Sequence, residues 1–232
     1  GAPDILQLLE GNCVPCAPPE PVTIRKTGRL AGHKDRVFDL RWSPAQPSRL
    51  ASVGQTGGFV WSTDGGAEPV PLVGFQLMRV CWQRDGTRVL VGNSEGKIDV
   101  LGAEDGAVRA TLEASAEHEV YGLEPLSGGE LLAVGADDTV QQWDLSRGVR
   151  TVEESFSICP RIGVVFGGPN RNPEHKACVF DLCTRGRILC AALSDGTVRV
   201  LDAQTLQTCG TLTEHARRGA ATYCVALSST SP

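Results

Sequence analysis

Residues Leu131–Leu145 read LLAVGADDTVQQWDL, a pattern that predicts two short strands joined by a tight turn. Apolar residues fill Leu131–Val134, and the small and acidic residues Gly135–Asp138 favour a turn. The second strand, Thr139–Trp143, ends in Trp-Asp. Related stretches recur along the chain, so the feature to be explained is a repeat.

The repeat is clearest where the beginnings of two distant units are compared. His33–Leu40 reads HKDRVFDL and His175–Leu182 reads HKACVFDL, which agree at six of eight positions. The third strand of each unit ends in Trp or Leu, at Trp61, Leu101, Trp143 and Leu201. The first two steps between these residues are about 40 residues, the period of a four-stranded propeller blade. The third step is longer, and its excess lies before His175.

The histidines give an independent check on the repeat. The chain has only four, and each stands just before the first strand of a unit: His33, His118, His175 and His215. We therefore expect His33, His118 and His175 to lie at equivalent positions, immediately before the innermost strands of three blades.

This repeat resembles the WD40 repeat, and the resemblance covers nearly everything from about Thr27 onward. It implies an all-β fold, a WD40-like β-propeller of four-stranded antiparallel blades. Radial packing explains the repetition, because a small sheet is unstable alone and buries its faces against neighbouring sheets. We expect four complete blades, at about 33–66, 67–113, 114–154 and 175–212, with an inserted loop at 153–174 and a partial blade at 213–232.

Four blades and a partial one predict an incomplete ring. Residues 1–21 are expected to form a proline-rich arm that precedes a propeller domain at 22–232. Tyr223–Leu227 is expected to be the inner strand of the partial blade, and Val22–Leu30 a strand at its outer side. An open edge invites closure or oligomerisation. The alternative is a five-bladed ring in which Ile5–Val14 and Val22–Leu30 pair with the C-terminal strand.

The WD40 resemblance also implies a set of structural residues. In that family a His, a Ser or Thr, an Asp and a Trp form a hydrogen-bond chain within a blade. The matching positions here are His33, Ser52 and Trp61 in the first unit, His118, Asp137 and Trp143 in the third, and His175 and Asp195 in the fourth. The second unit keeps only Glu95, and Ala133, Ala191 and Leu201 replace members of the set elsewhere. No unit has all four, so we expect stability to depend mainly on packing.

Candidate partner contacts lie on the face that carries these histidines and acidic turns. The insertion 153–174 reads EESFSICPRIGVVFGGPNRNPE, and connections of this length are usually functional or disordered. The alternative for this segment is a surface loop with a packed hydrophobic foot at Ile162–Phe166. The residues that we predict to contact a partner are Arg36, Glu119, Arg161, Asn170, Arg171 and Asn172.

These features favour a non-catalytic protein–protein interaction scaffold that works within a multiprotein complex. We find no GxSxG, HExxH or Gly-rich phosphate loop, and we expect no catalytic residues and no cofactor. The net charge of −5 gives no reason to expect direct nucleic-acid binding. No apolar run approaches the roughly 18 residues of a membrane span. The alternative function is a substrate-receptor adaptor of a cullin-type ubiquitin ligase. Asp144 and Arg147 resemble the docking motif of such adaptors, although the spacing between these two residues is one residue too long.

The nine cysteines predict a reducing compartment. Their number is odd and their spacing irregular, so we expect unpaired thiols and a cytoplasmic or nuclear location. Cys13 and Cys16 form a CxxC pair, which leaves open a third class of function, a redox or zinc protein. The prolines that follow the pair argue against the helix that a redox motif needs. Cys178 and Cys183 are the other close pair, and their alternation on a predicted strand indicates packing, so we expect no metal site.

Overall fold

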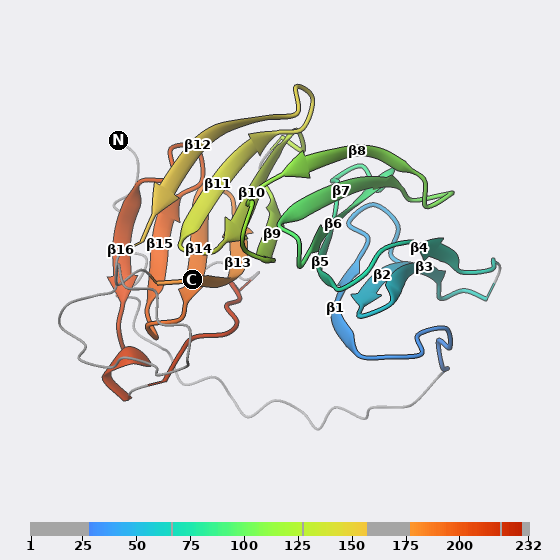
Figure 1. Ribbon diagram of the computed structural model, residues 1–232, viewed down its shortest axis with the longest axis horizontal. Helices are drawn as coiled ribbons and strands as arrows, with labels where there is room; N and C mark the ends of the chain where they lie inside the picture. The colour runs from blue at the N-terminus through green and yellow to red at the C-terminus, as the bar shows by residue number, and fades with distance from the viewer. Residues whose placement is uncertain (1–27, 66, 127, 157–176, 219, 229–232) are drawn as a thin grey trace. The chain divides into compact units, whose positions relative to one another are not determined.

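The structure, a computed structural model, describes residues 28–65, 67–126, 128–156, 177–218 and 220–228. All strands within these residues belong to one compact unit, His33–Leu227. They form four antiparallel sheets of four strands each, which are the blades of a four-bladed β-propeller arrangement (Figure 1). The all-β propeller fold predicted from the sequence is therefore confirmed. None of the helices among the described residues is long and apolar enough to cross a membrane.

Each blade takes its four strands in chain order. The first blade has β1 (Val37–Trp42), β2 (Arg49–Gly54), β3 (Gly57–Ser62) and β4 (Val70–Leu72). The second has β5 (Leu77–Trp82), β6 (Arg88–Asn93), β7 (Lys97–Gly102) and β8 (Val108–Glu113). The third has β9 (Val120–Pro125), β10 (Leu131–Ala136), β11 (Thr139–Asp144) and β12 (Val149–Ser155). The fourth has β13 (Val179–Arg185), β14 (Ile188–Leu193), β15 (Val198–Asp202) and β16 (Thr208–Leu212), followed by the 3-10 helix η1 (Ala216–Arg218).

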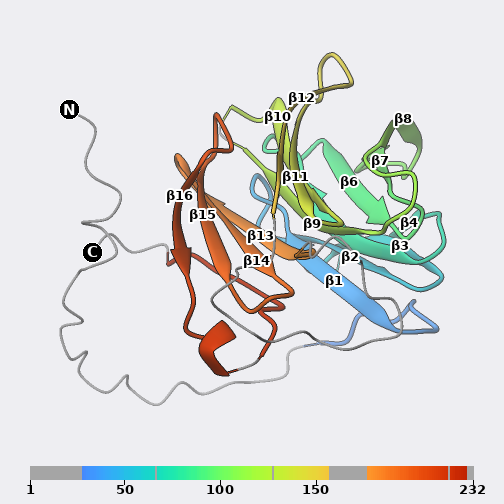
Figure 2. The ribbon, with the colours of Figure 1, turned by 60° about the vertical axis from the view of Figure 1, so that its left-hand side comes forward.

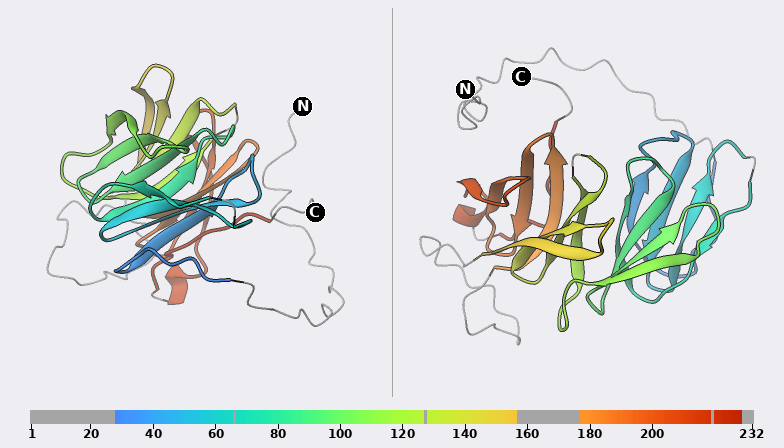
Figure 3. Two further views of the ribbon diagram at one scale, coloured as in Figure 1. Left: turned by 90° about the vertical axis from the view of Figure 1, so that its right-hand side faces the viewer. Right: turned by 90° about the horizontal axis from the view of Figure 1, so that it is seen from above.

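The first strand of each blade lies innermost. β1 contacts β5, β5 contacts β9, and β9 contacts β13, so the four first strands line a common axis in chain order (Figures 2 and 3). Each of these strands has the same register shift, a β-bulge at its second residue. A bulge redirects the extra side chain, and the four residues redirected here are Phe38, Met78, Tyr121 and Phe180. The shared bulge shows that the four blades are copies of one unit.

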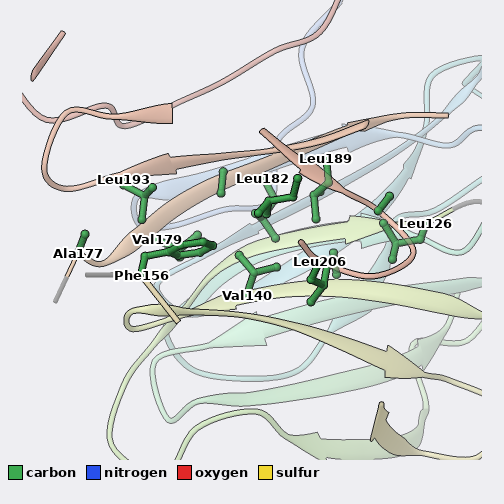
Figure 4. Packing of buried hydrophobic residues seen from close by; sticks show 13 residues of the cluster. Leu126, Val140, Phe156, Ala177, Val179, Leu182, Leu189, Leu193 and Leu206 are labelled. Carbon is green, nitrogen blue, oxygen red and sulfur yellow. The ribbon is translucent and has the colours of Figure 1, made fainter. Parts of the chain in front are cut away.

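Three apolar cores hold neighbouring blades together. The core between the third and fourth blades combines Val140 and Phe156 with Val179, Leu182 and Leu189, all fully or nearly fully buried (Figure 4). Corresponding cores lie between the first and second blades and between the second and third. Burying a side chain of this size contributes about 1.5–3 kcal/mol, so these cores supply most of the stability.

The strand boundaries differ from the sequence prediction in several places. β10 continues to Ala136, so the predicted turn Gly135–Asp138 is shorter than expected. Glu153–Ser155, assigned to the inserted loop, belongs to β12. Gly28–Leu30, the described end of the predicted strand Val22–Leu30, is not a strand. The rest of the insertion, the proline-rich arm and the Cys13–Cys16 pair lie outside the described residues.

Candidate binding face

A hollow opens on the face where the loops before the inner strands meet the β10–β11 turn. We call it the His118 hollow, and its volume is about 380 Å³. The second, third and fourth blades all contribute to it. Its lining consists of Ser94, Glu117, His118, Glu119, Tyr121, Asp137, Cys178 and Phe180.

Asp137 organises one wall of this hollow. It adopts a left-handed backbone conformation in the turn, with φ of 51°, which Asp tolerates better than most residues. Its Oδ2 lies 3.3 Å from His118 Nε2, and its backbone carbonyl accepts a 2.6 Å hydrogen bond from the Val179 amide. Burial raises the pKa of Asp137, and the nearby His118 opposes that rise. This one residue therefore joins the third blade to the start of β13.

Aromatic rings form a second wall. The Tyr121 hydroxyl donates a hydrogen bond to the Glu119 carboxylate, which fixes both side chains at the rim. Tyr121 meets Phe180 edge to face with ring centroids 5.9 Å apart. Phe180 in turn stacks on Tyr223 at 5.0 Å. Tyr121 and Phe180 both occupy the bulge position of an inner strand, so the shared bulge is what turns these rings toward one face.

The thiol of the hollow is a poor nucleophile. Cys178 Sγ lies 3.8 Å from Asp137 Oδ1, and burial together with that carboxylate raises the pKa of the thiol. A raised pKa keeps the sulfur protonated and a poor nucleophile. Among the described residues, no group of three His, Cys, Asp or Glu side chains is arranged to hold a metal ion. The arrangement can accept hydrogen bonds and attract a positive charge.

Charged side chains from the inner strands occupy the axis beneath the hollow. The Arg79 guanidinium of β5 donates to the Tyr121 carbonyl and, at 2.8 Å, to the Phe180 carbonyl. Arg41 of β1 lies 4.0 Å from the Asp181 carboxylate of β13. Glu124 of β9 accepts a 3.2 Å hydrogen bond from the Thr184 amide. These contacts connect inner strands directly, and the sequence analysis did not identify them.

The predicted repeat residues make different contacts in each of the three blades that carry them. In the first blade His33 Nε2 lies 2.7 Å from Ser52 Oγ, and Trp61 Nε1 donates to the same oxygen at 2.8 Å. His33 and His118 both precede the first strand of a blade, but His33 lies four residues before Val37 and His118 two residues before Val120. The prediction that these two lie at equivalent positions was therefore wrong, and His175 lies outside the described residues. In the fourth blade Asp195 accepts hydrogen bonds from the amide and hydroxyl of Thr197.

The third blade does not form the hydrogen-bond chain that the WD40 resemblance implies. The register pairs Leu123 with Val134, as it pairs Leu40 with Ser52, so Val134 and not Ala133 holds the place of Ser52. The sequence alignment was wrong by one residue at this point. Trp143 Nε1 instead donates to Gln141 Oε1 at 3.0 Å, on its own strand.

The predicted partner contacts are only partly described. Glu119 lines the His118 hollow. Arg36 is exposed before β1, where its carbonyl accepts a hydrogen bond from the Gln55 amide, and it does not line the hollow. The other four, Arg161, Asn170, Arg171 and Asn172, lie outside the described residues.

Asp144 and Arg147, which resemble the docking motif of ubiquitin-ligase adaptors, stabilise a turn in this structure. Asp144 Oδ1 accepts hydrogen bonds from the Ser146 hydroxyl and from the Ser146 and Arg147 amides, which closes the β11–β12 turn.

The six cysteines within the described residues, Cys81, Cys178, Cys183, Cys190, Cys209 and Cys224, are free thiols.

Comparison with known proteins adds no family assignment. No protein-family model matches the chain, and no curated protein matches it.

Proposed function

We propose that this chain is a divergent, non-catalytic interaction scaffold of the WD40 type that binds an extended segment of a partner protein across the His118 hollow. The observation that carries the proposal is the combination of carboxylates and aromatic rings in one concave site. Glu117, Glu119 and Asp137 contribute the carboxylates. Tyr121 and Phe180 contribute ring surface beside them.

This combination fits a basic side chain of the partner. A lysine or arginine head group is attracted by carboxylates and by the face of an aromatic ring within about 6 Å. A site of this kind holds one anchoring residue in a pocket, while the loops around it contact the flanking chain. The free thiols of the described part support a cytoplasmic or nuclear location for this interaction.

A peptide-binding measurement tests the proposal. We would screen an array of peptides that differ only at one central position and then measure affinities in solution by fluorescence anisotropy. We expect peptides with a central Arg or Lys to bind, and citrulline or norleucine at that position to weaken binding about tenfold or more. The affinity should fall as salt rises, because the attraction is between partly exposed charges.

Variants of the chain give the control. Glu119→Gln should weaken binding of the basic peptide about tenfold, whereas Glu104→Gln should not, because Glu104 is an exposed carboxylate paired with Arg49 and does not line the hollow. Equal binding of basic and neutral peptides, or equal effects of the two variants, would exclude a basic-residue site.

A further inference from the structure

Arg79 of β5 reaches the backbone of two other blades. Its guanidinium donates hydrogen bonds to the carbonyl of Tyr121 in β9 and, at 2.8 Å, to the carbonyl of Phe180 in β13. The same two residues supply the rings that form one wall of the His118 hollow. One side chain of the second blade is therefore bonded to the backbone of both ring-bearing residues.

Both carbonyls belong to bulge residues. The register gives Tyr121 no partner on β10 and Phe180 no partner on β14, because each is the extra residue of its inner strand. A backbone carbonyl outside the ladder needs a donor from elsewhere. Arg79 supplies a donor to each, and a hydrogen bond from a charged group is stronger than a neutral one. The guanidinium therefore stabilises the two bulges that turn these rings toward the hollow.

Arg79 differs in kind from the residues at its place in the other blades. It directly follows the bulge of β5, and the equivalent residues are Asp39, Gly122 and Asp181. Asp39 accepts a 3.1 Å hydrogen bond from the Val80 amide of the next inner strand. A carboxylate accepts from amides, whereas a guanidinium has only donors and bonds to carbonyls. Among the four described blades, only the second has a donor side chain at this place.

The shape of the guanidinium matches this pair of acceptors. Arg79 Nε bonds to the Tyr121 carbonyl and Nη2 to the Phe180 carbonyl, so one edge of the planar group spans both. Arginine presents such donors in a rigid fork, whereas the lysine ammonium is a single point charge on a flexible stem. A lysine in this place would keep the charge but would not reproduce the two bonds together.

We propose that Arg79 is a positioning residue of the His118 hollow, which holds the two bulge carbonyls and so sets the ring wall on which a basic side chain of the partner rests. Arg79 does not line the hollow, so it acts through Tyr121 and Phe180 and not by touching the partner. The effect on binding rests on the proposed function, whereas the placement of the rings can be measured without any peptide.

The charge of Arg79 and its placement predict opposite effects on a basic ligand. Its field reaches the hollow, because Arg79 opposes the rise in the pKa of Tyr121 that burial and Glu119 cause. A cation in this position repels a basic side chain, so loss of the charge alone should strengthen binding. Loss of the ring wall should weaken binding, because the contact between cation and ring is lost. The sign of the change in Arg79→Met therefore separates the two roles.

Fluorescence anisotropy with the central-Arg peptide tests the effect on binding. Arg79→Met and Arg79→Lys should each weaken binding about tenfold. Arg88→Met is the matched control and should bind like the wild type, because Arg88 is exposed at the start of β6 and does not line the hollow. In a Phe180→Leu background the effect of Arg79→Met should shrink to about threefold or less, because part of the wall is already gone. Unchanged or tighter binding by Arg79→Met, or fully additive effects, would overturn the proposal.

A fluorine NMR measurement tests the ring placement without a peptide. The chain has two tyrosines, so labelling with 3-fluorotyrosine gives two signals, and Tyr223→Phe leaves only that of Tyr121. Arg79→Met should shift or broaden the Tyr121 signal, and Arg88→Met should not. An unchanged Tyr121 signal would refute the positioning role, whereas a wild type that binds no basic peptide would refute the proposed function. Circular dichroism and thermal unfolding confirm the fold of each variant, and Arg79→Lys replaces Arg79→Met in both measurements if the latter is unfolded.

Discussion

Ser52 shows how single polar residues stabilise this fold. Its buried hydroxyl contacts both His33 and Trp61, which joins the segment before β1 to β2 and β3. Asp39 and Asp181 act in a similar way, since Asp39 accepts an amide hydrogen bond from Val80 of β5 and Asp181 accepts one from Val225. Polar side chains in the blades therefore connect elements that backbone pairing leaves separate.

Replacing Ser52 by Ala should lower the free energy of unfolding by about 1–3 kcal/mol, because the buried indole of Trp61 loses its hydrogen-bond partner. Ser146→Ala should change it by less than about 0.5 kcal/mol, because Ser146 is exposed in the β11–β12 turn. Urea denaturation followed by tryptophan fluorescence measures both. Equal losses in the two variants would show that the Ser52 contacts do not contribute.

Glu124 makes stability depend on pH. Burial raises the pKa of this carboxyl from 4.5 to about 7; the Thr184 amide and Arg41 oppose the rise, and Asp181 and Asp39 add to it. Between these two values the folded protein holds a proton that the unfolded chain has released. The stability from this group is therefore present at low pH and is lost as pH rises toward 7 and above.

We expect the free energy of unfolding to fall by up to about 3 kcal/mol from pH 5 to pH 8 because of this residue, at about 1.4 kcal/mol for each pKa unit. Glu124→Gln should remove that part of the pH dependence, and Glu104→Gln, at an exposed position, should retain it. Denaturation curves at several pH values measure the difference. Parallel pH profiles for wild type and Glu124→Gln would refute the assignment.

At the scale of elements, the sequence predicted the inner three strands of each blade better than the fourth. Most of these strands are buried on one or both sides and so appear as apolar runs; β1 is the exception, because four of its six residues are exposed. In β8 only Leu112 is buried, so that strand has no periodic signal and was not located.

Arg79 and Glu124 were missed because their place on the axis depends on the bulge, which leaves no mark in the sequence. The one-residue error at Ala133 has a similar cause, since register is fixed by pairing.

The β6–β7 turn positions the loop that carries His118. Gly96 has a φ of +76°, and a Cβ there would lie 2.3 Å from the Ser115 carbonyl oxygen and 2.7 Å from that of His118. Gly96→Ala should therefore lower stability by about 1–3 kcal/mol or more and also weaken peptide binding, because the loop must move.

Gly186 provides the matched control for this prediction. It also has a positive φ, of +60°, but a Cβ there would meet nothing within 4 Å. Gly186→Ala should cost about 1 kcal/mol, in the range expected for backbone conformation alone, and leave binding unchanged. Similar losses of stability and of binding in both variants would show that crowding at Gly96 is unimportant.

At the scale of the whole molecule, the same kind of interface between neighbouring blades occurs three times among the described residues. The three apolar cores hold the four blades in order. The same repeat positions are exposed on β1, on the side where none of the described blades lies. This predicts that the energetic role of a residue depends on its neighbouring blade and not on its place in the repeat.

The direct test compares Leu40→Ala with Leu182→Ala, which remove the same side chain from the same repeat position. Leu182 is 2% exposed between two blades, and Leu40 is 52% exposed. At concentrations below any self-association, we predict that Leu182→Ala lowers the free energy of unfolding by about 2–5 kcal/mol and Leu40→Ala by less than about 1 kcal/mol. Equal losses in the two variants would contradict the account, because they would show that the β1 face is packed as tightly as the inner interfaces.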